Sequence, residues 1–145
     1  MNAVRSRKDK RAYAQYLRSL GPAEGCQFCL LQPGDSQLLW ESNNFKIIIN
    51  RFPYALWDTK PVEEHLMLVP KQHTVTLKNL SPKESQEYVE LISDYEHRGY
   101  NIYARSPGSS MKSVLHQHTH LIKLSPTRRR RIIITTIKPF IKIAR

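Results

Sequence analysis

Three histidines stand at every second position near the end of this sequence: His116, His118 and His120, within the stretch Ser113–Leu124. Alternate side chains of a β-strand leave the same face, so a strand here would place the imidazoles side by side, roughly 6.6 Å apart at their roots. Two imidazoles at that spacing can flank a phosphoryl group, with one ring attacking phosphorus and the next donating a hydrogen bond to an oxygen. The alternative is a row of exposed or hydrogen-bonded histidines, but strict alternation favours chemistry on one face and packing on the other.

The two cysteines, Cys26 and Cys29, form a C-x-x-C motif. One pair cannot build a disulfide framework of the kind that small secreted domains use. The motif suits half of a four-ligand zinc site, and it equally suits a free or redox-active pair of thiols. The motif by itself leaves both interpretations open.

The positive charge of the chain is concentrated at its two ends. The 145 residues have a formal net charge of +11; residues 1–20 contain six Lys or Arg and one Asp, and residues 125–145 contain seven Lys or Arg and no acid. Residues 21–124 are nearly neutral, with ten basic and eleven acidic residues. We therefore predict one domain at 25–124, between a basic N-terminal extension at 1–24 and a basic C-terminal tail at 125–145. Basic ends suit contact with nucleic acid or an acidic partner, although solvated tails are commoner.

No apolar run in the sequence reaches the length of a membrane span or of a secretory signal. The default expectation is therefore a cytoplasmic protein without membrane contact. The basic, acid-poor start leaves an organellar transit peptide as the alternative.

The elements expected around the histidines form an α+β domain. A capping box, Ser81-Pro82-Lys83-Glu84, is followed by apolar residues at helical spacing and predicts a helix that ends before Gly99. Alternating or β-prone segments predict five strands, at 38–42, 45–50, 65–70, 100–104 and 113–124. The expected fold is a five-stranded antiparallel sheet with a helix between strands 3 and 4.

Three further segments lie outside these strands. Residues 8–20 place Tyr13 and Tyr16 at helical spacing and predict a short basic helix that a Gly-Pro pair ends. Residues 51–64 contain two prolines and three aromatic rings, which predicts a loop that either forms a lid or is anchored to the core by its rings. The apolar segment in 128–145 either pairs with an edge strand or is kept from pairing by its flanking arginines.

The motifs also match a known family. His116-Gln-His-Thr-His120 resembles the His-x-His-x-His signature of the histidine triad (HIT) nucleotide hydrolases and transferases. The turn at 108–110 resembles the diadenosine tetraphosphate hydrolase and phosphorylase branch. The family shares the expected α+β fold, and its members usually dimerise, so the resemblance implies a homodimer. The likeness covers roughly residues 25–124, in chain order through Cys26-Gln-Phe-Cys29, Phe45–Asn50, His65–His73 and Ser113-Val114.

The resemblance implies nucleophilic catalysis at the α-phosphate of a nucleotide. The middle histidine, His118, would form a nucleotidyl-histidine intermediate that water or another acceptor then cleaves. His120 would contact the scissile phosphate or the leaving oxygen, and Ser113 would hold a phosphate oxygen. Neutral imidazole is a good nucleophile near pH 7, and dividing one displacement into two lowers each barrier.

The resemblance also implies a set of nucleotide-binding residues. Asn50 matches a ribose-binding position, and Phe28 and Ile48 match the apolar base pocket, with plain core packing as the alternative for these two. Arg105 stands where relatives often have Asn or Gln; its guanidinium would suit the phosphates of a longer polyphosphate, unless it is a surface residue. The expected substrate is a purine nucleotide such as a dinucleoside polyphosphate.

In metal-carrying members of the family, two histidines complete the site that the C-x-x-C pair begins, and they match His73 and His116 here. The resemblance therefore implies a structural zinc held by Cys26, Cys29, His73 and His116, with a free or redox-active thiol pair as the alternative. His65 either shapes the edge of the loop or lies near the phosphates, and His97 is expected on the surface in the last turn of the helix; neither receives a firm role.

Two other functions are compatible with the sequence. One is a nucleotide-binding module with weak catalysis, whose basic ends bind nucleic acid or an acidic partner. The other is a nucleotidyltransferase with phosphate as the acceptor. The leaving group, the acceptor and the base preference do not follow from the sequence.

Overall fold

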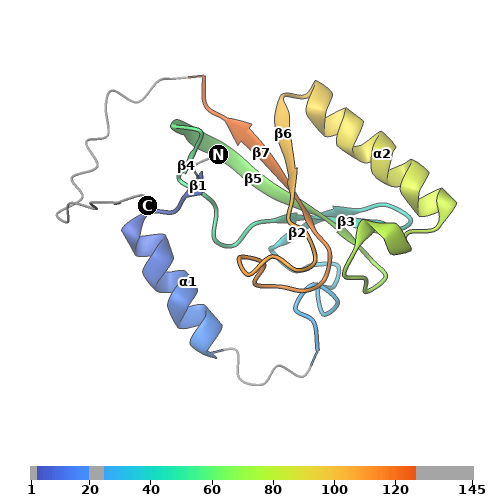
Figure 1. Ribbon diagram of the computed structural model, residues 1–145, viewed down its shortest axis with the longest axis horizontal. Helices are drawn as coiled ribbons and strands as arrows, with labels where there is room; N and C mark the ends of the chain where they lie inside the picture. The colour runs from blue at the N-terminus through green and yellow to red at the C-terminus, as the bar shows by residue number, and fades with distance from the viewer. Residues whose placement is uncertain (1–2, 20–24, 127–145) are drawn as a thin grey trace, which may run out of the picture.

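The five predicted strands form the main sheet of the computed structural model, which describes residues 3–19 and 25–126 (Figure 1). Every neighbouring pair is antiparallel, so the predicted α+β class and sheet are confirmed. Two very short strands, β1 (Ala3–Val4) and β4 (Leu56–Trp57), extend the sheet beyond the prediction. The five main strands, in spatial order, are β2 (Leu38–Glu41), β3 (Phe45–Ile49), β5 (Lys60–Pro70), β7 (Thr119–Leu124) and β6 (Tyr100–Ala104).

The predicted central helix is α2 (Pro82–His97), and it begins as its capping box predicts. The Ser81 hydroxyl accepts a hydrogen bond from the backbone N–H of Glu84, and the Ser81 backbone N–H donates to the Glu84 carboxylate. These two bonds satisfy donors that a helix N-terminus otherwise leaves unpaired. The helix stops before Gly99, whose φ of 86° lies in the left-handed region that glycine adopts most easily. A short 3-10 helix, η1 (Leu77–Asn79), precedes α2.

Alternation along the strands gives the sheet a packing face and a pocket face. The packing face buries Phe45, Ile47, Leu66, Leu68 and Leu121 beneath α2 (Figure 1). Each such side chain contributes about 1.5–3 kcal/mol when fully buried, which is enough to fix the position of the helix. The opposite face carries Met67 and His120, which are paired across β5 and β7.

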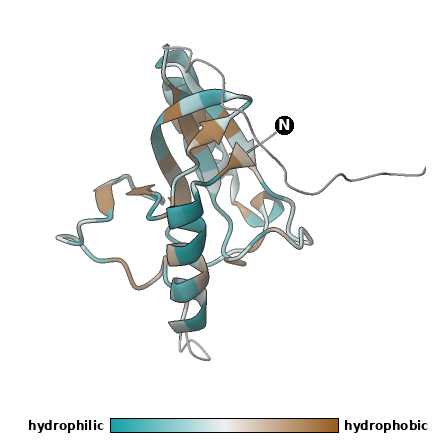
Figure 2. Cartoon of the chain, turned by 90° about the vertical axis from the view of Figure 1, so that its left-hand side faces the viewer, coloured by the Kyte–Doolittle hydropathy of each residue, from teal (hydrophilic) through white to brown (hydrophobic). Residues whose placement is uncertain are grey.

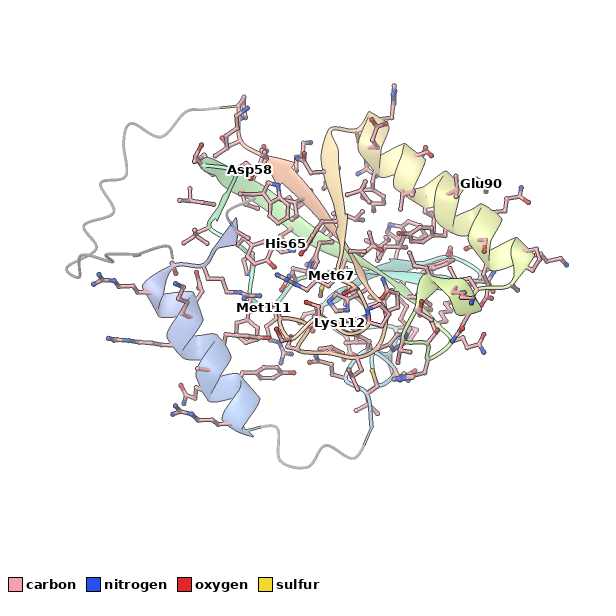
Figure 3. The ribbon with its side chains drawn as sticks, in the orientation of Figure 1. Asp58, His65, Met67, Glu90, Met111 and Lys112 are labelled. Atoms are coloured by element: carbon pink, nitrogen blue, oxygen red, sulfur yellow. The ribbon has the colours of Figure 1, made fainter. Side chains whose placement is uncertain are left out.

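The segment 51–64 is not the continuous loop that its prolines predicted. β5 starts at Lys60 rather than at residue 65, and its first residues pair with β4 in a hairpin. Asp58 and Thr59 at the tip have φ values of 47° and 67°, the left-handed pair of a type I′ turn, here without the usual glycine. Figure 3 shows Asp58 at the far end of β5 from Met67. The prediction was wrong because Asp-Thr carries no strong hairpin signal.

The histidine strand is shorter than predicted. β7 begins at Thr119, so of the three histidines only His120 lies in a strand. His116 and His118 stand in irregular backbone, where the N–H of Gln117 donates to the carbonyl of Thr74 at 2.6 Å. This contact ties the approach to β7 to the chain that follows β5. All three imidazoles are nevertheless buried, with 1 to 6% of their surface exposed.

The N-terminal segment lies against one edge of the domain. β1 pairs with β4, and α1 (Arg7–Ser19) follows it, close to the helix predicted at 8–20. Figure 2 shows α1 as a largely hydrophilic helix. The Gly-Pro pair expected to end it and the tail beyond residue 126 lie outside the described residues. Neither α1 nor α2 has the length and apolar character of a membrane-spanning helix.

Candidate active site and metal centre

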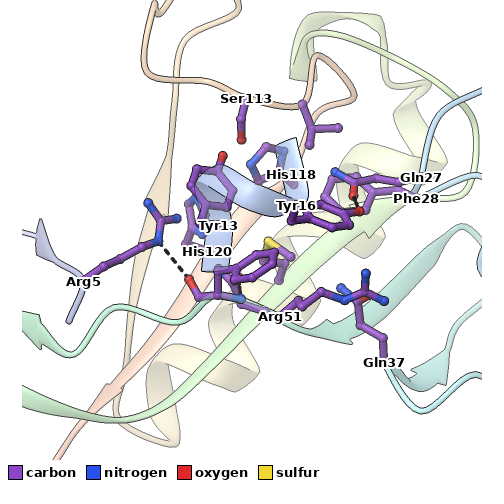
Figure 4. Close-up of a pocket in the computed structure, with 14 residues that line it drawn as sticks. Arg5, Tyr13, Tyr16, Gln27, Phe28, Gln37, Arg51, Ser113, His118 and His120 are labelled. Atoms are coloured by element: carbon purple, nitrogen blue, oxygen red, sulfur yellow. Dashed lines mark hydrogen bonds between the residues drawn. The ribbon is translucent and has the colours of Figure 1, made fainter. Parts of the chain in front are cut away.

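His118 and His120 line a pocket on the sheet face opposite α2 (Figure 4). Tyr13 and Tyr16 of α1 lie across this pocket beside the two histidines. The free space is about 60 Å³, whereas small-molecule sites usually offer roughly 300–1,000 Å³. The N-terminal segment therefore closes much of the pocket. The remaining walls come from Arg5, Gln27, Phe28, Gln37, Asn50, Arg51, Phe52, Met67, Ser113 and Val114.

The orientation of His118 is set by the backbone two residues before it. Its Nδ1 atom lies 2.8 Å from the carbonyl oxygen of His116. A carbonyl only accepts hydrogen bonds, so a neutral His118 carries its proton on Nδ1 and donates it there. The lone pair is then on Nε2, in a side chain that lines the pocket. His118 therefore has the tautomer that a nucleophile at Nε2 requires.

A second chain of contacts assigns the proton of His120. The backbone N–H of Tyr54 donates to Nδ1 of His65 at 3.2 Å, so a neutral His65 carries its proton on Nε2. That Nε2 lies 2.9 Å from Nδ1 of His120 and donates to it. The remaining ring proton of His120 is consequently on its own Nε2. His120 is thus prepared to donate a hydrogen bond next to His118, whose ring centre is 5.1 Å away.

Burial keeps these imidazoles uncharged. Burial lowers the pKa of His118, and although the bond to the His116 carbonyl raises it, the charges of Lys112 and Arg105 lower it further. Burial lowers the pKa of His120 well below its usual value and that of His65 to about 3. Because all three values lie below 6.5, the three rings are neutral at pH 7.

Two of the four predicted nucleotide-binding residues line the pocket. Asn50 and Phe28 line it, and the Phe28 ring centre is 5.4 Å from that of His118. The Asn50 amide oxygen is already engaged, since it accepts the N–H of Phe52. The exposed Ser113 also lines the pocket, above His118 in Figure 4.

Ile48 and Arg105 are placed differently from these residues. Ile48 is fully buried in the apolar cluster behind Phe28 and is not among the lining residues. Arg105 is outside the lining as well; it donates to the hydroxyl of Tyr54 at 3.3 Å and lies over the ring of Tyr103. Arg105 therefore reaches the site through a tyrosine that contacts His65 and His120.

The four predicted zinc ligands come together in the structure. The sulfur and ring-nitrogen atoms of Cys26, Cys29, His73 and His116 all lie within 4.8 Å of one another. Three sulfur-to-Nδ1 distances are 3.3, 3.4 and 3.5 Å. Tetrahedral zinc with bonds of about 2.0–2.3 Å separates its ligands by roughly 3.3–3.8 Å. The donor set and its spacing therefore fit zinc.

The sequence interpretation missed two groups at this site. His65 was expected at the loop edge or near the phosphates but received no firm role, and its contact with His120 was not predicted. Arg5, Tyr13 and Tyr16 were assigned to an extension, yet they form part of the pocket wall. Helical spacing could predict the helix, but nothing local could predict where it packs.

Three solved structures share the fold of this chain. A solved protein from Leishmania major, described as hypothetical, is 20% identical over 79% of this chain and 84% of its own, with a TM-score of 0.54. A HIT family hydrolase from Clostridium thermocellum is 18% identical over 75% of this chain and 98% of its own, with a TM-score of 0.52. A zinc-bound histidine triad family protein from Mycobacterium smegmatis is 24% identical over 70% and 76%, with a TM-score of 0.50.

At these identities the three solved structures show a shared fold. No curated protein matches this sequence. Residues 35–127, more than half of the chain, match the HIT domain family. The chain therefore belongs to the HIT domain family.

Proposed function

We propose that this protein is a nucleotide hydrolase or nucleotidyltransferase that acts at the α-phosphate of a purine nucleotide through His118. The observation that carries the proposal is the 2.8 Å contact between Nδ1 of His118 and the carbonyl of His116. It leaves the Nε2 lone pair for attack, beside a His120 whose Nε2–H can donate a hydrogen bond.

In the first step, Nε2 of His118 forms a bond to the α-phosphorus while the bond from phosphorus to the leaving oxygen breaks. His120 donates a hydrogen bond from Nε2–H to that oxygen and stabilises the negative charge with which it leaves. The intermediate is a nucleotidyl-histidine whose cationic ring is stabilised by the carbonyl that Nδ1 faces. Water then attacks phosphorus and the bond from phosphorus to Nε2 of His118 breaks. This releases the nucleoside monophosphate and a proton to solvent, and it restores neutral His118. Inorganic phosphate in place of water would yield a nucleoside diphosphate.

The other residues bind the substrate in this proposal. Ser113 holds an oxygen of the α-phosphate, and Asn50 contacts the ribose once the nucleotide displaces its present partner. Phe28 packs against the base, with Ile48 supporting it from the buried side. Arg105 contributes positive charge toward the phosphates.

We also propose that Cys26, Cys29, His73 and His116 bind a structural zinc ion. Zinc supplies no catalytic step here. It would fix the segment before β7, because His116 also provides the carbonyl that orients His118. The fit of the four ligand atoms supports this assignment over a redox-active thiol pair.

The test is turnover by the wild type and by His118→Ala. Dinucleoside polyphosphates, nucleoside phosphoramidates and adenylylated amines would be assayed with and without phosphate, and acid-quenched samples would be examined for nucleotidylated protein by mass spectrometry. His97→Ala is the matched control, since His97 is an exposed histidine at the end of α2. We expect His118→Ala to abolish turnover while nucleotide binding survives. Wild-type turnover in His118→Ala would refute the mechanism.

A second candidate is a nucleotide-binding module whose basic ends bind nucleic acid. The basic face of α1 supports it, because Arg7, Lys8, Lys10 and Arg11 are exposed beside the pocket. Binding of that kind would weaken steeply with salt, whereas turnover through His118 would not. The expected homodimer and cytoplasmic location stay predictions, and sedimentation analysis would check the first.

A further inference from the structure

Arg5 reaches the pocket from the N-terminal segment. Its Nε donates to the carbonyl of Phe52 at 3.1 Å. Its guanidinium carbon lies 4.5 Å from the ring centre of Tyr13 and 4.9 Å from that of Tyr54. The two rings and the carbonyl hold the guanidinium in one place at the pocket wall. Figure 4 shows it beside His120.

The charge of Arg5 has no anionic partner among the described residues. The two ion pairs found there both use Glu41, with Lys46 and with Lys71. The hydrogen bond to Phe52 uses Nε and leaves the terminal NH2 groups without a protein acceptor in the described part of the chain. A half-buried guanidinium that is held in place and has unpaired terminal NH2 groups can bind an anion.

The positive charge lies where a leaving group would stand. The Arg5 charge lowers the pKa of both His65 and His120, so its electrostatic field acts on this hydrogen-bonded pair of histidines. Tyr54 contacts Arg5 with its ring face and accepts a hydrogen bond from Arg105 with its hydroxyl. The cationic side chains of Arg5 and Arg105 therefore both contact Tyr54, which lies against His120. Their charges lie on the His120 side of the pocket, away from the Phe28 side where the proposed base would pack.

We propose that Arg5 binds phosphate groups of the leaving group and thereby selects nucleotides joined through a phosphoanhydride to one or more further phosphates. The proposal rests on the proposed function at His118. An amine leaving group, as in a nucleoside phosphoramidate, carries no anion for Arg5 to bind. Arg5 lies outside the residues 35–127 that match the family, so this selectivity belongs to the N-terminal segment of this chain.

Binding of AMP and of α,β-methylene-ATP tests the proposal directly. The analogue cannot be cleaved at the α-phosphorus, so the full-length wild type can be titrated calorimetrically. We expect Arg5→Gln to weaken α,β-methylene-ATP about 10- to 100-fold, the range for a lost charge-assisted contact, and AMP less than about twofold. Arg5→Lys should recover part of the loss. Arg11→Gln is the matched control, because it removes the same charge from the exposed face of α1 and should leave both ligands unaffected.

A purely structural role for Arg5 gives a different result. If Arg5 only anchors the segment, Arg5→Gln will change the affinities for AMP and for the analogue by the same factor. Tyr16→Phe should do the same, since it loses the hydrogen bond to Gln27 but keeps the guanidinium. Equal weakening, or no weakening, would overturn the inference while the proposed function stands. A wild type that binds neither ligand would overturn the proposed function, and the inference with it.

Turnover gives an independent readout. Arg5→Gln should lower kcat/KM for a dinucleoside polyphosphate about 10- to 100-fold and leave kcat/KM for adenosine 5′-phosphoramidate within about twofold. Equal losses for both substrates would contradict the selectivity. Circular dichroism of each variant establishes that a loss is not one of folding, and Arg5→Lys supplies the second variant if Arg5→Gln is unstable.

Discussion

The Nε2 atom of His65 lies 2.9 Å from the Nδ1 atom of His120, although 55 residues separate them in the sequence. The backbone N–H of Tyr54 occupies the other nitrogen of His65, so the proton between the two rings belongs to His65. A buried imidazole that received no firm role from the sequence therefore decides which nitrogen of His120 carries the proton.

Removing that imidazole should impair catalysis more than binding. We expect His65→Leu to lower kcat about 10²- to 10⁴-fold, because His120 can then adopt the wrong tautomer. His65→Gln keeps an N–H near the Nε2 position and should lose less. Steady-state kinetics would measure the split between kcat and KM, and ¹⁵N NMR would report the His120 tautomer. Equal activity of His65→Leu and wild type would show that the contact does not orient His120.

His65 should also make folding stability depend on pH. Burial lowers its pKa to about 3 from 6.5, so between these values the unfolded chain binds a proton that the folded protein does not. The full stability is present above about pH 6.5 and declines as the pH falls, by up to about 1.4 kcal/mol per pH unit for this one group. Urea unfolding of wild type and His65→Gln from pH 7.5 to 4.5 checks this. The variant should show the shallower slope, and identical slopes would mean that His65 is charged in the folded protein.

Zinc should bind with a stoichiometry of about one and depend on His73. We expect His73→Ala to reduce the zinc content of protein purified without chelator or histidine tag to below about a tenth of an equivalent. Chelation should lower Tm by at least about 5 °C, since structural metal binding contributes directly to folding. His97→Ala is the control, because both histidines are exposed and only His73 lies with the cysteines. Elemental analysis and thermal unfolding measure the two effects; zinc-free wild type would contradict the site.

The closed pocket predicts that α1 must move before a nucleotide enters. About 60 Å³ of free space cannot hold a nucleotide, and none of the three apolar clusters of described residues includes a residue of α1. Losing the Tyr16 hydrogen bond to Gln27 in Tyr16→Phe should therefore ease opening and raise the association rate constant about fivefold, as expected for about 1 kcal/mol. Stopped-flow mixing with a fluorescent nucleotide measures this rate.

Tyr95→Phe provides the comparison for that experiment. It also removes a tyrosine hydroxyl that forms a hydrogen bond, here with Trp40, but Tyr95 belongs to α2 and is buried against the packing face of the sheet. Its association rate should equal that of the wild type. If Tyr16→Phe is likewise unchanged, opening of α1 does not limit nucleotide entry.

The sequence by itself determined the features that depend on residues close together in the chain. Ser81 and Glu84 are three residues apart and formed the predicted capping box, and the apolar alternation from Phe45 to Ile49 produced a strand with two distinct faces. The spacing of Cys26 and Cys29, with the three histidines, was sufficient for the resemblance to the family that the matched residues 35–127 then confirmed. Each of these signals is read within one turn or a few strand residues.

Only the tertiary structure decided which groups meet and which proton each carries. Strict alternation predicted a strand from Ser113 onward, yet the contact of Gln117 with Thr74 keeps His116 and His118 out of β7. That irregular backbone brings the His116 carbonyl to Nδ1 of His118. The contact of His65 with His120 joins residues 55 positions apart in the sequence. The hydrogen bond from Arg5 to Phe52 joins residues 47 positions apart. Such contacts follow from how the sheet and α1 pack, and no local spacing encodes them.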